Sequence, residues 1–191
     1  MAHHDDDGLW VFATRELARR PGTMRSVNRT VPAPSLIGTE VIGVPAGEPV
    51  VLDLTMESVV EGVLATAEVV VTARGMCVRC LDEATHDVQV TAQELFAYPE
   101  RASRHAQHDS AAEDQEQYEL QDDTIDLETV VRDAVVTALP FQPVCRPDCP
   151  GLCAQCGVRL ADEPRHAHDT VDPRWAALAD LAGSNPTERR T

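Results

Sequence analysis

Residues 59–74 read VVEGVLATAEVVVTAR, a run rich in the valine and threonine side chains that favour extended strands. Gly62 inside this run predicts a bulge or a close approach of another backbone. Residues 85–98 read THDVQVTAQELFAY, in which apolar and polar side chains alternate with the period of two of a half-buried antiparallel strand. With the alternating segment 50–54, these runs predict a small, mostly antiparallel sheet or an open barrel. Turn signals separate the runs, at Pro45-Ala46-Gly47, Gly75 and Asp82-Glu83.

One apolar stripe predicts the main helix, because its members recur with helical spacing: Leu127, Val130, Val131, Ala134, Val135 and Ala138. Asp126 is placed to cap the N-terminus of this helix, and Glu128 lies at the positive end of its dipole. Glu128 and Arg132 form an i,i+4 pair on the outer face, and Pro140 ends the helix. The stripe is expected to pack on the sheet. The predicted fold class is therefore α+β, with a cysteine-rich zinc knuckle toward the C-terminus.

Shifts in composition divide the chain into six expected segments. These are a disordered N-terminus (1–8), a β-rich core with a basic N-terminal segment (9–98), an acidic flexible loop (99–123), the core helix (124–143), a four-cysteine knuckle (144–160) and a tail with a short helix (161–191). The acidic loop stands out because residues 109–128 hold nine acids and no arginine. Asp172 and Pro173 mark the start of the short helix in the tail.

The overall charge and the absence of common motifs exclude several classes of protein. The chain has 32 acidic residues and 16 arginines, with no lysine, for a net charge of −16. No apolar run reaches the roughly 18 residues of a membrane span, and the N-terminus lacks a secretory signal, so we expect a cytoplasmic protein with no membrane partner. Without a P-loop, a dinucleotide-binding glycine pattern, a nucleophile elbow or HExxH, we expect neither enzymatic activity nor a small-molecule substrate.

The N-terminal segment 12–30 is the basic exception in this acidic chain. It carries a local charge of +4, from one acid, Glu16, and five arginines: Arg15, Arg19, Arg20, Arg25 and Arg29. These arginines are the candidate RNA-binding residues, because each phosphate they neutralise releases counterions and adds affinity. The alternative is that they pair with acids of the same protein, which has twice as many acidic as basic residues.

Six cysteines carry the candidate metal chemistry, and none stands alone. Cys77 and Cys80 form one CxxC, and four more follow close together: Cys145, Cys149, Cys153 and Cys156. A CxxC turn lets two thiolates converge on one Zn²⁺. In the favoured arrangement the four C-terminal cysteines bind a structural zinc ion, because ligands within twelve residues need little loop-closure entropy.

A long-range zinc site is the alternative arrangement. It pairs Cys77 and Cys80 with Cys153 and Cys156, as in a zinc ribbon, and leaves Cys145 and Cys149 spare. His166 and His168 are possible substitute ligands, although histidines in a polar loop are usually surface residues. Disulfides are disfavoured in a reducing compartment. A thioredoxin-type redox pair needs a CxxC that opens a helix, whereas strand patterns flank Cys77 and Cys80.

Five pieces of the sequence stand in a characteristic order over nearly the whole chain. They are Arg15-Glu16-Leu17 with Pro21-Gly22; Glu57-Ser58-Val59-Val60-Glu61-Gly62-Val63; Cys77-Val78-Arg79-Cys80-Leu81 with Glu94-Leu95-Phe96; Ile125-Asp126-Leu127 through Ala138-Leu139-Pro140; and Cys145 to Gly157 with Asp172-Pro173-Arg174-Trp175. In this combination the chain resembles the YceD family, domain of unknown function 177. It is most similar to the branch from high-GC Gram-positive bacteria that carries the C-terminal cysteine knuckle.

The resemblance implies a cytoplasmic bacterial protein that is not an enzyme. Such a protein would support accumulation of 23S ribosomal RNA and hence assembly of the large ribosomal subunit. Its partner would be 23S rRNA or its precursor, or a large-subunit ribosomal protein, which suits the acidic surface better. A competing hypothesis is a zinc- or thiol-responsive sensor, which predicts a reversible structural change when zinc is lost.

Overall fold

A computed structural model describes residues 8–101 and 118–168, together with Arg174 and Leu178. The chain divides into two compact units, Met1–Cys149 and Pro150–Thr191, each with its own internal contacts. Residues 1–7 of the predicted disordered N-terminus and residues 102–117 of the acidic loop lie outside the described residues. The short helix predicted from Asp172 onward is also outside them, apart from Arg174 and Leu178.

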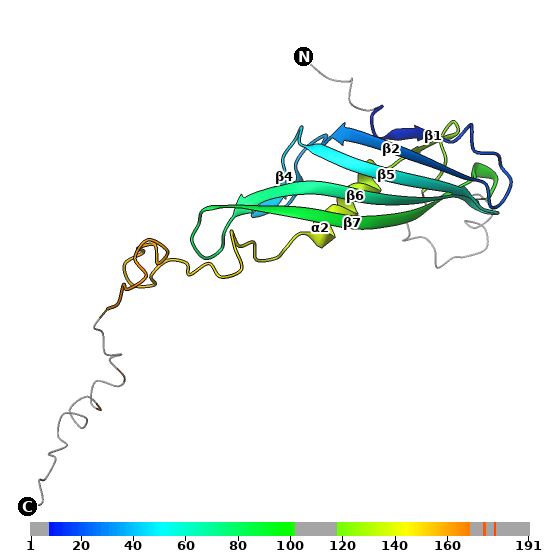
Figure 1. Cartoon of the computed structure of the whole chain (residues 1–191). Helices are drawn as coiled ribbons and strands as arrows, with labels where there is room; N and C mark the ends of the chain where they lie inside the picture. Colours follow the sequence, from blue (N-terminus) through cyan, green and yellow to red (C-terminus); the bar gives the residue numbers. More distant parts are fainter. Residues whose placement is uncertain (1–7, 102–117, 169–173, 175–177, 179–191) are drawn as a thin grey trace, which may run out of the picture. The chain divides into compact units, whose positions relative to one another are not determined.

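The first unit is built on a six-stranded antiparallel sheet (Figure 1). Its long strands are β2 (Met24–Pro32), β5 (Pro49–Ser58), β6 (Gly62–Met76) and β7 (Glu83–Ala97), and its short strands are β3 (Ile37–Gly38) and β4 (Ile42–Val44). The central strand is β6, which pairs with β7 along one side and with β5 and then β4 along the other. The sheet does not close on itself. The predicted antiparallel sheet is therefore confirmed, in its open form.

Side chains alternate along the strands between a buried face and an exposed face, as the pleat requires. In β5, Leu52, Leu54 and Met56 are completely buried, whereas Asp53 between them is exposed. Strand β2 was not predicted from the sequence, since its arginines mark the segment as basic and its burial alternates, over most of its length, only between exposed and half-buried residues. Arg25 and Arg29 lie on the half-buried side of β2 and the polar residues between them on the exposed side.

Two glycines let neighbouring backbones pass close to β6. A Cβ atom at Gly62 would lie 2.0 Å from the carbonyl oxygen of Phe96, so the close approach predicted there is confirmed. Gly75 differs from the prediction of a turn, because it lies inside β6. A Cβ atom there would lie 2.3 Å from the carbonyl oxygen of Val41, next to β4. Gly75 thus permits strand packing, and the chain reverses after it.

The main helix, α2 (Glu128–Ala138), packs against β7, β3 and β6 (Figure 1). Val131 and Val135 of the predicted stripe are fully buried, whereas Ala138 at its end is exposed. Leu127 takes the N-cap position, but the carboxylate of Asp126 still accepts a hydrogen bond from the Glu128 N–H at 2.9 Å. The predicted Glu128–Arg132 ion pair forms at 2.8 Å, and Leu139 closes the helix before Pro140.

The end of the acidic segment is folded into the first unit. Strand β8 (Thr124–Asp126) pairs with β1 (Val11–Ala13), and Glu119 bridges to Ala97 at the end of β7. Leu120 is buried in the core, with Tyr118 packed against the same core. Tyr118 and Leu120 thus attach residues 118–123, the end of the predicted acidic loop (99–123), to the core of the first unit.

The described part of the second unit is a small hairpin around a CxxC turn. Leu152 and Arg159 form an antiparallel bridge, and the Cys153 N–H donates to the Val158 carbonyl at 2.8 Å. No helix in the described part of the chain is long and apolar enough to cross a membrane.

Candidate functional site

The first CxxC forms the turn that joins β6 to β7. The Cys77 N–H donates to the Asp82 carbonyl at 2.7 Å, and the Leu81 N–H donates to the Cys77 carbonyl at 2.9 Å. The backbone amide of Arg79 points at Cys77 Sγ, 3.4 Å away. Leu81 adopts the left-handed conformation with φ of 63°. This tight turn places the sulfur atoms of Cys77 and Cys80 close together.

The segment that follows α2 is attached to this turn by hydrogen bonds. The Val78 N–H donates to the Pro143 carbonyl at 2.9 Å. The Arg79 guanidinium donates to the carbonyls of Pro147 at 3.3 Å and Cys149 at 3.0 Å. Arg79 therefore holds the backbone that carries Cys145 and Cys149 against the hairpin.

Four thiols meet where the turn and this segment touch. Cys77 Sγ lies 3.8 Å from Cys149 Sγ, and Cys80 Sγ lies 3.6 Å from Cys145 Sγ. All four sulfur atoms lie within 4.8 Å of one another. A disulfide needs about 2.05 Å, so these thiols are unbonded. Zinc–sulfur bonds of about 2.3 Å in tetrahedral geometry separate the sulfur atoms by about 3.8 Å, so the group, here called the four-thiol cluster, is positioned to hold a metal ion.

The surroundings of the four-thiol cluster favour a thiolate at Cys77. Burial opposes this by raising the pKa of the Cys77 thiol, but hydrogen bonds from the backbone N–H groups of Cys145, Cys80 and Arg79 outweigh it and lower the pKa to about 6. Cys77, Cys80 and Cys149 are buried, while Cys145 is exposed. The thiolate is the form that binds metal, and backbone dipoles stabilise it at Cys77. At Cys80, a hydrogen bond from the Asp82 backbone lowers the pKa of the thiol, but burial and the neighbouring thiols outweigh it and raise the pKa to about 12, and burial raises the pKa of Cys145.

A second group of metal-ligating side chains lies in the second unit, here called the cysteine–histidine cluster: Cys153, Cys156, His166 and His168. Its four ligand atoms also lie within 4.8 Å of one another. Backbone N–H groups of Gln155 and Cys156 lower the pKa of the Cys153 thiol to about 6.

The structure thus divides the predicted ligand set of Cys145, Cys149, Cys153 and Cys156 between two groups. It places the first pair with Cys77 and Cys80, a combination that neither predicted arrangement contained, and the second pair with the two histidines. A signal for this division is present in the sequence. Six cysteines and two nearby histidines make eight ligands, which is two tetrahedral sets.

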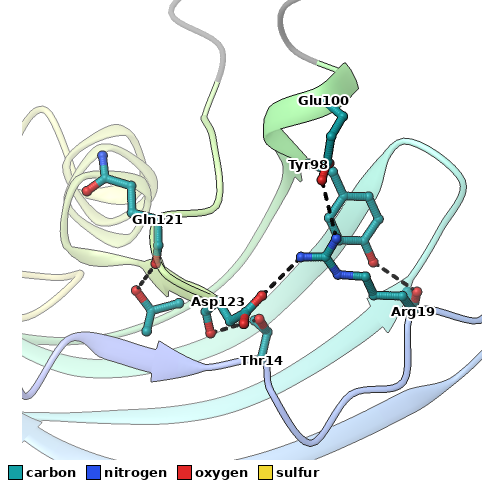
Figure 2. Close-up of polar contacts among 8 residues, drawn as sticks. Thr14, Arg19, Tyr98, Glu100, Gln121 and Asp123 are labelled. Atoms are coloured by element: carbon teal, nitrogen blue, oxygen red, sulfur yellow. Dashed lines mark hydrogen bonds and ion pairs between the residues drawn. The ribbon is translucent and has the colours of Figure 1, made fainter.

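Arg19, of the arginine segment, is engaged by acids of the same unit (Figure 2). Its guanidinium lies 3.1 Å from a carboxylate oxygen of Asp123 and 3.6 Å from one of Glu100. It also stacks over the Tyr98 ring, 4.9 Å from the centroid. The hydrogen bond to Asp123 raises the pKa of Arg19 above its ordinary value.

The other arginines divide into two classes. Arg25 pairs with Glu16 at 2.9 Å, and Arg29 donates to the Leu9 carbonyl at 3.0 Å while stacking over Phe12. Arg15 and Arg20 are exposed, and neither has an ion-pair partner among residues 8–101 and 118–168. Three of the five predicted RNA-binding arginines are thus engaged in intramolecular contacts.

The exposed face of the sheet is acidic. Asp53 of β5 and Glu68 of β6 are register partners, so two carboxylates stand directly opposite each other. Like charges at this spacing destabilise a sheet. Arg74, the basic residue on β6, is paired with Glu48 at 3.2 Å and Glu83 at 3.6 Å. Asp53 and Glu68 therefore have no ion-pair partner among the residues that the structure describes, and this face carries net negative charge.

Comparison with known proteins supplies a family. The family model described as "Large ribosomal RNA subunit accumulation protein YceD" matches residues 65–182. Uncharacterized proteins of Mycobacterium bovis and Mycobacterium tuberculosis are each 50% identical over 167 residues, which cover 87% of this chain and 78% of the relative. An uncharacterized protein of Mycobacterium leprae is 45% identical over 171 residues, or 90% of this chain and 76% of the relative. No solved structure gives a significant match.

Proposed function

The chain belongs to the YceD family, and we propose that it is a non-enzymatic factor that supports 23S rRNA accumulation and large-subunit assembly in the bacterial cytoplasm. We propose further that it acts by binding a basic ribosomal protein of the large subunit rather than the RNA itself. The description of the family names an accumulated RNA, not a reaction.

The choice of a protein partner rests on the contacts that the arginines of the N-terminal segment 12–30 make within the fold. Arg19, Arg25 and Arg29 are used within the fold, which leaves Arg15 and Arg20 as the exposed basic pair of that segment. Two arginines on a body of net charge −16 are a weak attraction for a phosphate backbone, whose affinity depends on the number of neutralised charges. The same charge steers a cationic partner toward the protein.

The four-thiol cluster has a structural part in this proposal. Four thiolates would complete the tetrahedral sphere of Zn²⁺ and leave no open position for water or a substrate, which is the pattern of a structural site. Bound there, zinc would supply a crosslink between the β6–β7 turn and the segment after α2. Arg79 and the Val78 amide orient the same two pieces of backbone, so the ligands are held together before any ion binds.

The test compares two charge variants of the full-length protein, each altering two exposed side chains. One variant, Asp53→Asn with Glu68→Gln, removes the opposed carboxylates, and the other, Arg15→Gln with Arg20→Gln, removes the exposed arginines. Cells carrying tagged versions are crosslinked, and the captured large-subunit proteins and RNA are identified and quantified. We expect the amount of captured basic ribosomal protein to fall about fivefold or more in the variant Asp53→Asn with Glu68→Gln. The arginine variant should capture as much of it as the wild type.

The opposite pattern overturns the proposed partner. Enrichment of a defined 23S rRNA region that disappears in the arginine variant alone would identify RNA as the partner. If both variants still capture the ribosomal protein and the rRNA, neither the opposed carboxylates nor the exposed arginines form the contact, which would overturn the proposed binding surface. If no large-subunit component is captured by the wild-type protein, the role in assembly itself fails, and the sensor hypothesis becomes the remaining candidate.

A further inference from the structure

The second unit contains an arrangement that the proposed function does not use. Its CxxC turn presents Cys153 and Cys156, and the short segment that follows brings His166 and His168 back to them. We propose that these four residues form a second zinc site, separate from the four-thiol cluster, so that one chain binds two ions through different ligand sets. This inference does not depend on the identity of the ribosomal partner.

The four ligand atoms lie close enough together to converge on a single ion. Cys156 Sγ lies 3.2 Å from Nε2 of His166 and 3.2 Å from Nε2 of His168, and the two Nε2 atoms are 2.8 Å apart. Both histidines therefore present the same ring nitrogen to one point. A hydrogen bond between the two rings would account for the last distance, but not for both sulfur atoms lying within 4.8 Å of both nitrogens.

The groups behind the ligands match those of known zinc sites. His166 Nδ1 lies 3.3 Å from a carboxylate oxygen of Glu163, which is the carboxylate–histidine contact that fixes the ring so that Nε2 faces a metal. The Gln155 amide points at Cys153 Sγ from 3.5 Å, as expected of the N–H groups around a metal-bound thiolate. Two sulfurs and two imidazoles are the donor set of the commonest structural zinc modules.

The described part of this unit, residues 150–168, lacks buried side chains, which gives an independent reason for a metal. Within residues 150–168, only Gly151 is buried, so no side chain in this range is fully shielded from water. Its hairpin is held by backbone hydrogen bonds such as Gly157 N–H to the Cys153 carbonyl at 2.8 Å. A segment as short as residues 150–168 without buried side chains usually needs a metal or a disulfide to hold its fold, and Cys153 and Cys156 are free thiols.

Metal stoichiometry of the full-length protein tests the proposal. Native mass spectrometry and elemental analysis of wild-type protein should give two zinc ions per chain. The double variant His166→Ala with His168→Ala should retain one, and a matched control at an exposed residue next to the ligands, Arg165→Ala, should retain two. Replacement by Co²⁺ adds a spectroscopic signature, because a site with two sulfurs absorbs differently from one with four. The histidine variant should lose the two-sulfur component alone.

Folding of each unit is followed in the same samples. In amide nuclear magnetic resonance spectra, the histidine variant should lose the dispersed resonances of residues 151–168 and keep those of the sheet. The combination Cys153→Ser with Cys156→Ser should reproduce this result, which guards against a defect peculiar to one variant. One zinc ion in the wild type that is unaffected by removing the two histidines would overturn the proposal. So would a full complement of two ions in the histidine variant.

Discussion

The two CxxC turns of this protein have nearly the same backbone and very different surroundings. Cys77 N–H donates to the carbonyl five residues on at 2.7 Å, and Cys153 does the same at 2.8 Å. The residue after the second cysteine is left-handed in both, with φ of 63° at Leu81 and 72° at Gly157. An amide N–H reaches the first sulfur at 3.4 Å and 3.5 Å respectively. Short spacing thus determines the local turn.

The structure around the turn differs completely between the two. The first closes a long hairpin, and its sulfur atoms join Ala84 and Cys149 in a small buried cluster. The second closes a hairpin of a few residues, where Cys156 and His168 remain exposed. A CxxC turn therefore prepares two ligands, while the rest of the fold decides which other two complete the set and how well water is excluded from them.

Removing one ligand from each cluster is the strongest test of that comparison. We expect Cys149→Ser to abolish metal binding at the four-thiol cluster and lower the melting temperature of the first unit by about 10 °C or more. The reason is that a structural zinc contributes several kcal/mol, and 1 kcal/mol shifts the midpoint by roughly 2–4 °C at this size. Cys156→Ser, followed by the same calorimetry and metal analysis, should leave that transition unchanged. If either change alone removes all bound metal, the four C-terminal cysteines form a single site.

Burial should separate the two sites kinetically. Because Cys77 is completely buried whereas Cys156 and His168 are exposed, a coloured chelator should withdraw one equivalent of zinc quickly and the second much more slowly. Stopped-flow absorbance measures both phases. The variant His166→Ala with His168→Ala should lack the fast phase only. A single phase containing both equivalents would show that the two sites open together, against the difference in burial.

The smallest expected effect concerns the left-handed residue after each CxxC. Gly157→Ala should destabilise the second turn and weaken its zinc affinity by about fivefold to thirtyfold, because the left-handed conformation costs a residue with a Cβ atom roughly 1–2 kcal/mol. Leu81→Gly relieves the same strain at a side chain that is 60% exposed, so the stability of the first unit should stay within about 1 kcal/mol of wild type. Zinc competition titrations and thermal unfolding measure the pair. Equal losses from both changes would mean that the shared backbone geometry is not what supports the turns.

Much of the fold follows from periodicity. The long strands β6 and β7 and helix α2 were predictable, because the alternation of apolar and polar residues and the apolar helical stripe each indicate which side chains face the core. The prediction failed where another property hid the pattern. In β2 the alternation was missed because charged arginines occupy half-buried positions. Gly75 is a residue type common in turns, but here it lies within β6 and lets the backbone of β4 approach closely. At Leu120, one apolar side chain in an acidic stretch helps to anchor it.

Composition and spacing alone determined which chemical groups this protein has. They give enough thiols and imidazoles for two four-coordinate metal sites, a net negative charge, and CxxC turns that bring two thiolates together. How these groups combine was decided by the folded chain. Loop-closure entropy favours neighbours in an unfolded chain, yet Cys77 meets a thiol 72 residues away. The sheet and α2 have already closed that loop in forming the core, so the distant ligands meet at little further entropic cost. The same packing directs Arg19, Arg25 and Arg29 to groups of their own chain, which no count of charges could reveal.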